Sequence, residues 1–200
     1  MKTCCQLLLL LTAGLLINAC KKEEAQPQTP TNLVRNGDME TYPWNDWIPY
    51  FGYNITSNPN GYINEYSIEA ASSGTHSIKA TCTTVKNDTT FIVFYQLISP
   101  ESFKVGNKLT LKAKIKTVNI VGKGISLVIR GDKVVNGKST VPFFATTQGT
   151  TQITGNSDFK EYTITSDAYP GNLDYITLYL IYLPQTTGTA YFDDVSLTIK

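Results

Sequence analysis

The sequence predicts an all-β fold, either a sandwich of two sheets or a barrel. From Asn32 onward, short segments alternate apolar and polar residues at period two and are rich in Val, Ile, Thr, Tyr and Phe. Gly, Asn and Pro separate these segments, and no stretch shows a convincing helical periodicity. The chain has 200 residues, which is enough for one domain with a substantial core.

The clearest strand pattern lies at residues 109–116. Its expected core face carries Leu109, Leu111, Ala113 and Ile115. We interpret the opposite face, with Lys112, Lys114 and Lys116, as a solvated strand face rather than an anion site. The other expected strands are Ser77–Thr83, Thr90–Ile98, Gly124–Arg130, Glu161–Thr165, Tyr175–Leu183 and Ala190–Ile199.

Two segments depart from simple alternation. The strand expected at 175–183 is apolar on both faces, so it either lies centrally under a loop or lines a groove. Residues 131–157 are rich in Gly and Thr, and we expect an extended loop there, with or without a hairpin, that serves binding or is disordered.

The charge balance excludes some classes of function. The chain has 17 Lys and Arg against 16 Asp and Glu, so it lacks the cationic excess of a nucleic-acid-binding surface. It has one histidine, no closely spaced acidic pair of the glycosidase type, and no serine-hydrolase or zinc signature. We therefore expect no enzyme. The tripeptide Arg130-Gly131-Asp132 spells a cell-adhesion motif, but so short a motif recurs by chance.

The N-terminal segment resembles the signal of a bacterial lipoprotein. Lys2 precedes an apolar run at 6–17 that is too short for a comfortable membrane span, and Leu16-Ile17-Asn18-Ala19-Cys20 resembles a lipobox. The resemblance implies cleavage before Cys20 and acylation of that residue with chains such as palmitate. The alternative is an ordinary secretory signal followed by a chance cysteine.

The sequence thus divides into a signal peptide at 1–19, the lipidated Cys20 with a flexible linker at 20–31, and a β-sandwich domain at 32–200. Lys21-Lys22-Glu23-Glu24 resembles the short export tag of some Gram-negative surface lipoproteins, which implies the outer membrane and the cell surface. Cleavage leaves Cys20 and Cys82, so no internal disulfide is expected. Cys82 continues an alternating run with His76, and we expect both to be structural.

Aromatic residues concentrate at 42–66, where eight of them, including both tryptophans, are interleaved with Asn, Asp and Glu. Flat rings can stack on the apolar faces of sugars while polar side chains bond to hydroxyls, so this segment predicts a sugar-binding surface. The candidate residues are Trp44, Trp47, Tyr50, Tyr53, Tyr62 and Tyr66, with Gln96 and Tyr179 added if their strands line a concave sheet. The alternative is that individual rings pack in the core or in loops.

Five short blocks together resemble the carbohydrate-binding modules of families 4 and 9. They are Asn32–Glu40 (NLVRNGDME), Ser73–Ala80 (SGTHSIKA), Tyr95–Ile98 (YQLI), Val105–Leu111 (VGNKLTL) and Gly188–Leu197 (GTAYFDDVSL). The resemblance implies a galactose-binding-like jelly roll, a two-sheet antiparallel sandwich, that binds glycans without cleaving them. Met39 departs from the usual Phe, and residues 131–157 do not align.

The same resemblance implies a structural calcium that ties the first strand to the last, with Glu40 and Asp193 or Asp194 as side-chain ligands. The alternation of Tyr191, Asp193, Val195 and Leu197 also places Asp193 on the buried side, where an unpaired carboxylate is costly. The alternative is an Asp that accepts hydrogen bonds from backbone amides in a turn.

The sequence therefore predicts a glycan-binding surface lipoprotein in a polysaccharide capture or uptake system, beside separate hydrolases. Its expected partners are an oligo- or polysaccharide, the membrane through Cys20, and neighbouring glycan-uptake proteins, with no nucleic acid. The alternative is a structural or adhesive lipoprotein whose sandwich binds a protein partner. Open rings at Trp44, Trp47, Tyr50 and Tyr53 would favour sugar.

Overall fold

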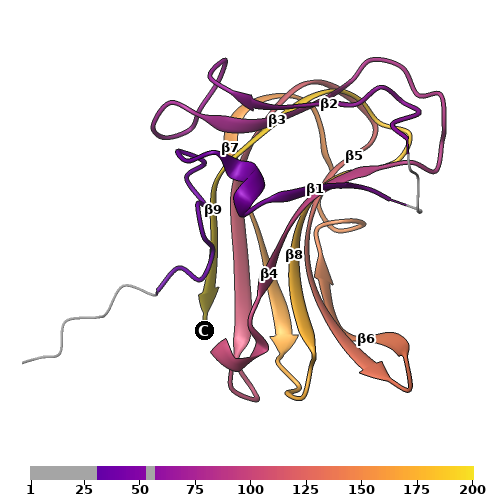
Figure 1. Ribbon diagram of the computed structural model, residues 1–200. Helices are drawn as coiled ribbons and strands as arrows, with labels where there is room; N and C mark the ends of the chain where they lie inside the picture. Colours follow the sequence, from indigo (N-terminus) through magenta and orange to yellow (C-terminus); the bar gives the residue numbers. More distant parts are fainter. Residues whose placement is uncertain (1–30, 53–56) are drawn as a thin grey trace, which may run out of the picture.

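The computed structural model describes residues 31–52 and 57–200 (Figure 1). Its strands are β1 (Ile48–Phe51), β2 (Ile63–Ser67), β3 (Ser77–Cys82), β4 (Ile92–Ile98), β5 (Lys108–Val135), β6 (Lys138–Thr146), β7 (Ile153–Ala168), β8 (Tyr175–Tyr182) and β9 (Thr187–Ile199). Two single-turn 3₁₀ helices, η1 (Pro43–Asn45) and η2 (Pro100–Ser102), are the only helices in the described part of the chain. The all-β prediction is confirmed.

All strand pairs are antiparallel, and the long strand β5 belongs to two layers (Figure 1). Its first half pairs with β9 and β7, which gives a layer in the order β2-β3-β9-β5-β7, named here the β9 sheet. Its second half pairs with β8 and β6, which gives a layer in the order β1-β4-β8-β5-β6, named here the β8 sheet. This is the expected two-sheet jelly-roll sandwich.

Glycines allow β5 to bend from one sheet into the other. Gly122 and Gly124 have φ angles of 100° and 85°, a region that L-residues with side chains rarely adopt. A Cβ atom at Gly122 would collide with the carbonyl oxygen of Gln185, and one at Gly124 with that of Ile153. The bend therefore requires glycine both for its backbone conformation and for the close approach of neighbouring backbone.

The core lies between the two sheets. Phe94 of β4 and Phe192 of β9 pack edge to face with ring centroids 5.9 Å apart, so the contact joins the sheets. The predicted core residues of β5, Leu109, Leu111, Ala113 and Ile115, are fully buried. Cys82 is also buried as expected, and burial raises the pKa of its thiol.

Three strands were not expected from the sequence. β1 and β2 lie within the aromatic segment, and β6 lies within residues 131–157. The extended loop predicted there is wrong, but the hairpin alternative is correct, because Asn136 and Gly137, with φ angles of 51° and 74°, form a two-residue turn between β5 and β6. Threonines of this segment suit strands as well as loops.

The N-terminal predictions lie outside the described residues, because residues 1–30, including Cys20, are not described. Within residues 31–52 and 57–200, no helix has both the length and the apolar character needed to cross a membrane.

We predict that Gly124→Ala destabilises the protein more than Gly137→Ala. Both glycines have positive φ, but a Cβ atom at Gly137 meets no neighbouring atom. Urea denaturation should show a loss of about 3 kcal/mol in unfolding free energy for Gly124→Ala and about 1 kcal/mol for the control. Equal losses would contradict the role of close backbone contact at the bend.

Candidate functional site

The outward face of the β9 sheet is covered by ion pairs. The Nζ atom of Lys79 lies between the carboxylates of Glu65 and Glu69, at 2.9 and 2.7 Å. Three lysines in the first half of β5 also form ion pairs: Lys112 with Glu161, Lys114 with Asp194, and Lys116 with Asp158. Exposed pairs of this kind contribute little to stability, and their charges are already balanced. This is the solvated face that the sequence predicts.

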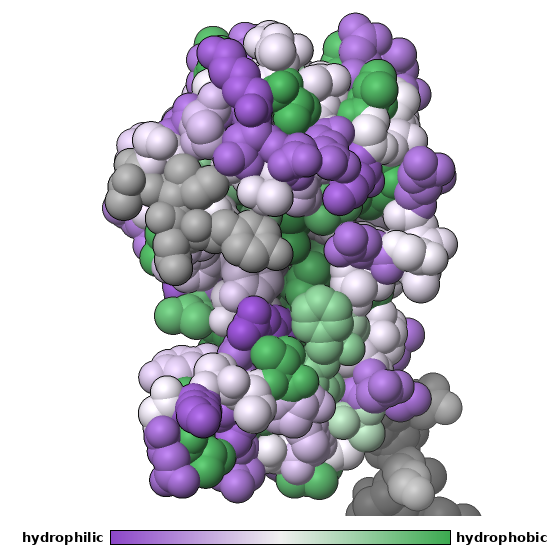
Figure 2. Space-filling view, turned by 90° about the vertical axis from the view of Figure 1, so that its right-hand side faces the viewer, coloured by the Kyte–Doolittle hydropathy of each residue, from purple (hydrophilic) through white to green (hydrophobic). Residues whose placement is uncertain are grey.

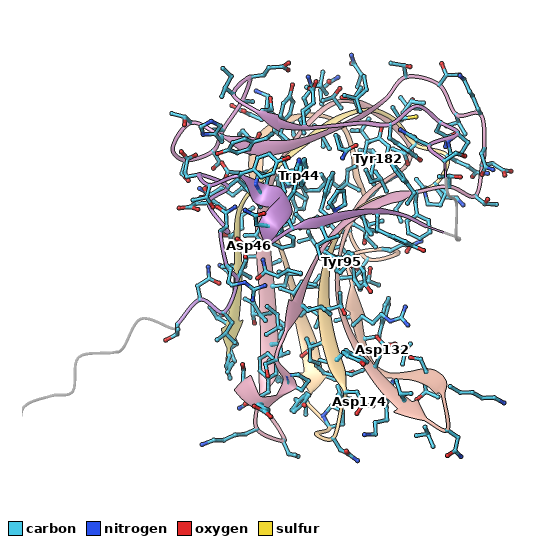
Figure 3. The ribbon with its side chains drawn as sticks, viewed as in Figure 1. Trp44, Asp46, Tyr95, Asp132, Asp174 and Tyr182 are labelled. Carbon is cyan, nitrogen blue, oxygen red and sulfur yellow. The ribbon has the colours of Figure 1, made fainter. Side chains whose placement is uncertain are left out.

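The outward face of the β8 sheet carries aromatic rings instead. Tyr95 of β4 pairs in register with Tyr179 of β8, so both side chains leave the same face, and their rings lie 6.1 Å apart at 44°. Figure 3 labels Tyr95 near the middle of this sheet. The rings border a groove with a cavity volume of about 430 Å³. Its lining residues are Tyr50, Phe91, Val93, Tyr95, Leu97, Arg130, Thr177 and Tyr179.

Some of the exposed hydrophobic residues lie on the side of the molecule that carries β6. Figure 2 shows them in a band between more hydrophilic regions above and below, on the side where β6 lies in Figure 1. Leu97 in the groove is 48% exposed, and Phe144 of β6 pairs in register with Arg130 of the groove. The groove is thus partly apolar, as a surface that binds an amphipathic ligand must be.

An internal ion pair fixes the charged residue of the groove. Arg130 donates two hydrogen bonds to Asp132, at 2.8 and 2.7 Å, and Ser139 donates a third to the same carboxylate. Burial alone would raise the pKa of Asp132, but these bonds outweigh it and the pKa lies below its ordinary value. The hydrogen bond to Asp132 raises the pKa of Arg130. The Arg130 side chain is 38% exposed, and its guanidinium is therefore held in place with donors left for a ligand.

Two of the expected binding residues line this groove, Tyr50 and Tyr179. The groove alternative for the strand at 175–183 is therefore the one that the structure shows. Burial raises the pKa of Tyr179, so its hydroxyl stays protonated and able to donate a hydrogen bond. Tyr53 lies outside the described residues.

Three expected binding residues are buried, and the prediction that they are open to a ligand is wrong. Trp47 is 0% exposed and its Nε1 donates to the carbonyl of Asn36. The hydroxyl of buried Tyr62 donates to the carbonyl of Thr90. Gln96 points into the core face of β4. Its side-chain amide accepts from and donates to the backbone of Arg35, at 2.8 and 3.0 Å. Trp47 and Gln96 thereby anchor the first residues of the domain, whereas Tyr62 holds the segment before β4.

The remaining two expected residues form a separate aromatic cluster. Trp44 is half-buried and stacks on the core residue Phe94, with centroids 5.6 Å apart (Figure 3). Tyr66 stacks on His76 at 4.3 Å, and Tyr42 packs edge-on against both Trp44 and Tyr66. The period-two alternation would place His76 on the core face, but this expectation is wrong. His76 precedes β3, and its ring turns toward Tyr66.

Sequence reasoning missed Tyr95 and Arg130. The alternation within β4 carried the signal, because Tyr95 and Gln96 are neighbours and must point to opposite faces. Once Gln96 is placed in the core, Tyr95 lies on the groove side, opposite Tyr179. Arg130 sits on that same face of β5, where it pairs in register with Thr177.

The final strand contains a bulge that overturns the expected alternation. Three residues of β5, from Lys112 to Lys114, oppose four of β9, from Asp193 to Ser196. Asp194 has a φ angle of 47°. Phe192, rather than Tyr191, consequently shares the core with Val195 and Leu197.

Asp193 is fully buried, as expected, and is satisfied by backbone amides. It accepts hydrogen bonds from the N–H groups of Ser72 at 2.6 Å, Ser73 at 3.1 Å and Asp194 at 2.7 Å. Burial still raises the pKa of Asp193. The hydroxyls of the same two serines donate to the carboxylate of Asp194. The middle of β9 thus holds the loop before β3.

Glu40 holds the same loop from the other side. Its Oε1 accepts the N–H groups of Thr75 and His76, both at 2.8 Å, and its Oε2 accepts the hydroxyl of Thr75 at 3.0 Å. The backbone hydrogen bond from Thr75 contributes most to lowering the pKa of Glu40, which falls to about 2. No Cβ atom fits at Gly74, which lies against the carboxyl group of Glu40.

The side-chain ligands of the calcium site implied by the sequence resemblance, Glu40 with Asp193 or Asp194, all accept hydrogen bonds from the loop before β3. In the described part of the chain, no three His, Cys, Asp or Glu side chains gather closely enough to hold a metal ion. Glu40 and Asp193 direct their oxygens at amide donors, so the amide-bonded alternative describes them better. The tie between the first and last parts of the domain is therefore built from hydrogen bonds.

No protein-family model matches the chain, and no curated protein sequence matches it. Solved structures do resemble it. One named for a family 4 carbohydrate-binding module has a TM-score of 0.55 and 19% identity over 84% of this chain and 99% of that one. Another structure, named as a family 16 carbohydrate-binding module, has a TM-score of 0.52 and 17% identity, with the same coverage of both chains.

A third structure is the enzymatically active domain of tailspike protein 4 from bacteriophage CBA120, with a TM-score of 0.56 and 14% identity. The match covers 84% of this chain but 21% of the tailspike chain. At these identities, the comparisons show the fold, which is the jelly roll of carbohydrate-binding modules. The family 4 and family 16 structures are both carbohydrate-binding modules.

We predict that Glu40→Gln lowers the melting temperature at neutral pH and flattens its dependence on pH between 4.5 and 2. The pKa of Glu40 is depressed in the folded state from 4.5 to about 2. Its stabilising contribution is therefore complete above about 4.5 and is lost as the pH falls toward 2. Thermal melts across this range, with exposed Glu101→Gln as control, test this. A difference between wild type and Glu40→Gln that does not change with pH would contradict it.

Proposed function

We propose that this chain is a non-catalytic glycan-binding protein that holds an oligo- or polysaccharide in the groove of the β8 sheet. The observation that carries the proposal is the pair of rings at Tyr95 and Tyr179 within that groove. A sugar ring has apolar C–H faces that pack on aromatic rings and a rim of hydroxyls that need hydrogen-bonding partners. Arg130, Thr177 and the tyrosine hydroxyls supply those partners along the groove.

The groove supports binding rather than cleavage. Glycoside hydrolysis ordinarily uses two carboxyl groups that flank the scissile bond. None of the described residues that line the groove is an Asp or Glu, and the nearby carboxylate of Asp132 is bonded to Arg130 and Ser139. The similar carbohydrate-binding modules support the same conclusion through their fold.

The proposed setting is the outer-membrane surface of a Gram-negative bacterium. Support comes from the lipobox-like Leu16–Cys20 and the charged run at 21–24, which imply an acylated anchor followed by a flexible linker. There the domain would capture glycan for neighbouring uptake proteins and separate hydrolases. Its partners would be the polysaccharide, the membrane and those uptake proteins.

The alternative, an adhesive or structural lipoprotein that binds a protein partner, is favoured by one observation. Ile48 and Leu97, on the same face as the tyrosines, are aliphatic and about half exposed. Aliphatic side chains offer no flat stacking surface for sugars, whereas they are common where proteins meet. Glycan screening separates the two functions.

We predict that a glycan array identifies ligands for the purified protein and that Tyr95→Ala and Tyr179→Ala each weaken binding about three- to tenfold. Each ring contributes on the order of 0.5–1.5 kcal/mol beyond its buried area. Tyr42→Ala is the matched control, because Tyr42 is 56% exposed and lies outside the groove. Circular dichroism confirms folding of all three variants. Full binding by both groove variants would place the site elsewhere, and an array without ligands would favour the protein-partner alternative.

We also predict that the full-length protein incorporates labelled palmitate and sediments with membranes. Cys20→Ala should abolish both properties, because it removes the acylated thiol. Cys5→Ala, within the signal segment, should change neither. Retention of the label by Cys20→Ala would overturn the proposed anchor.

A further inference from the structure

The groove of the β8 sheet, which Tyr95 and Tyr179 border, continues beyond Phe91. This residue lines both the groove and a second hollow that also includes Ile181 and Pro184. The second hollow shares Lys123, Gln148 and Leu183 with a third, which is formed against the β6–β7 loop. The three hollows therefore form one path along the strands of the β8 sheet, from Tyr95 and Tyr179 to Lys123.

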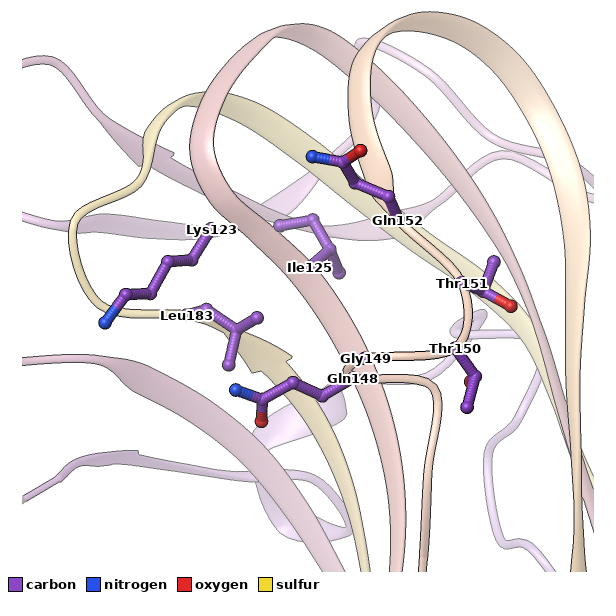
Figure 4. Close-up of a pocket in the computed structure, with 8 residues that line it drawn as sticks. All are labelled: Lys123, Ile125, Gln148, Gly149, Thr150, Thr151, Gln152 and Leu183. Carbon is purple, nitrogen blue, oxygen red and sulfur yellow. The ribbon is translucent and has the colours of Figure 1, made fainter.

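The far end of this path differs in chemistry from its middle. Buried Ile125 and Leu183 form an apolar floor, and exposed Gln148, Thr150, Thr151 and Gln152 surround it with hydrogen-bonding side chains. Figure 4 shows Lys123, Leu183 and Gln148 gathered on one side of this pocket, with Gln152, Thr151 and Thr150 on the other.

The loop that carries these polar groups is anchored. The buried side chain of Thr147 accepts the N–H group of Leu127 at 2.9 Å, and its own N–H group donates to the carbonyl of Leu127. Its carbonyl accepts the N–H groups of Thr150 and Thr151. The side chains at the end of the path are therefore held on a defined turn, which lowers the entropy that a ligand loses on binding.

The path carries an unbalanced positive charge. Its charged lining residues are Arg130 and Lys123, and none of its described lining residues is acidic. Asp132 balances Arg130. Exposed Lys123 forms no ion pair with any described residue, in contrast to Lys79, Lys112, Lys114 and Lys116 of the β9 sheet. An ammonium group in such a position favours a ligand that brings a negative charge.

We propose that the groove binds an anionic glycan, with a uronic acid carboxylate or a sulfate ester placed at Lys123. This inference rests on the proposed function of the groove and names its substrate class. The sugar rings would stack on Tyr95 and Tyr179. The amide groups of Gln148 and Gln152 would hydrogen-bond to the anionic unit and its hydroxyls.

The test is affinity electrophoresis of the purified full-length protein in gels that contain one glycan each. The panel holds neutral polysaccharides (xylan and a β-glucan), polygalacturonate and alginate for carboxylates, and carrageenan for sulfate esters. Each gel includes wild type, Lys123→Gln, Tyr95→Ala and, as control, Lys104→Gln, an exposed lysine outside the path. Repeating the gels at higher salt measures the electrostatic contribution.

We expect an anionic glycan to retard wild type and Lys104→Gln equally, and salt to weaken this retardation. Lys123→Gln should weaken it about three- to fivefold, as expected for the loss of one exposed ion pair. Whether polygalacturonate and alginate or carrageenan gives the effect identifies the anionic group. Retardation by neutral glycans alone, or equal retardation of the two lysine variants, would overturn this inference. The proposal of glycan binding would still stand if Tyr95→Ala weakens the retardation. No retardation by any glycan would overturn both proposals.

Discussion

The structure depends on one constraint, the passage of β5 from one sheet into the other at Gly122 and Gly124. Because the backbone has positive φ there and neighbouring carbonyls approach closely, β5 serves as a central strand in both layers. Its first half presents lysines to solvent on the β9 sheet, and its second half presents Arg130 to the groove of the β8 sheet. One strand thereby supplies both a solvated face and part of the lining of the groove.

The two ends of the domain are joined by polar groups rather than by apolar packing alone. Gln96 bonds to the backbone of Arg35, and Glu40 and Asp193 hold the loop before β3. Such bonds satisfy buried or half-buried polar atoms and fix the geometry of segments that have few core residues. The aromatic residues around them, Trp47 and Tyr62 above all, have a structural role.

Much of the fold could be predicted from the sequence, and less of the site. Period-two alternation located the strands of the core correctly, since burial of one face leaves a local signal at Leu109–Ile115. Residues that depend on distant contacts were not predictable in this way. The bulge at Asp194 shifts the alternation of β9, and the burial of Trp47 reflects packing at the end of the sandwich. Of the candidate residues in 42–66, the structure places Tyr50 in the groove, buries Trp47 and Tyr62, and puts Trp44 and Tyr66 in a separate aromatic cluster.

The central claim is that a glycan lies on the β8 sheet between Tyr95 and Tyr179. An NMR titration of the isotope-labelled protein with an oligosaccharide ligand tests this most directly, because ring resonances report stacking residue by residue. Stacking in the groove should shift the ring signals of Tyr95, Tyr179 and Tyr50 on titration, while those of Tyr42 and Tyr66 stay in place. Shifts confined to Tyr42, Trp44 and Tyr66 would contradict it.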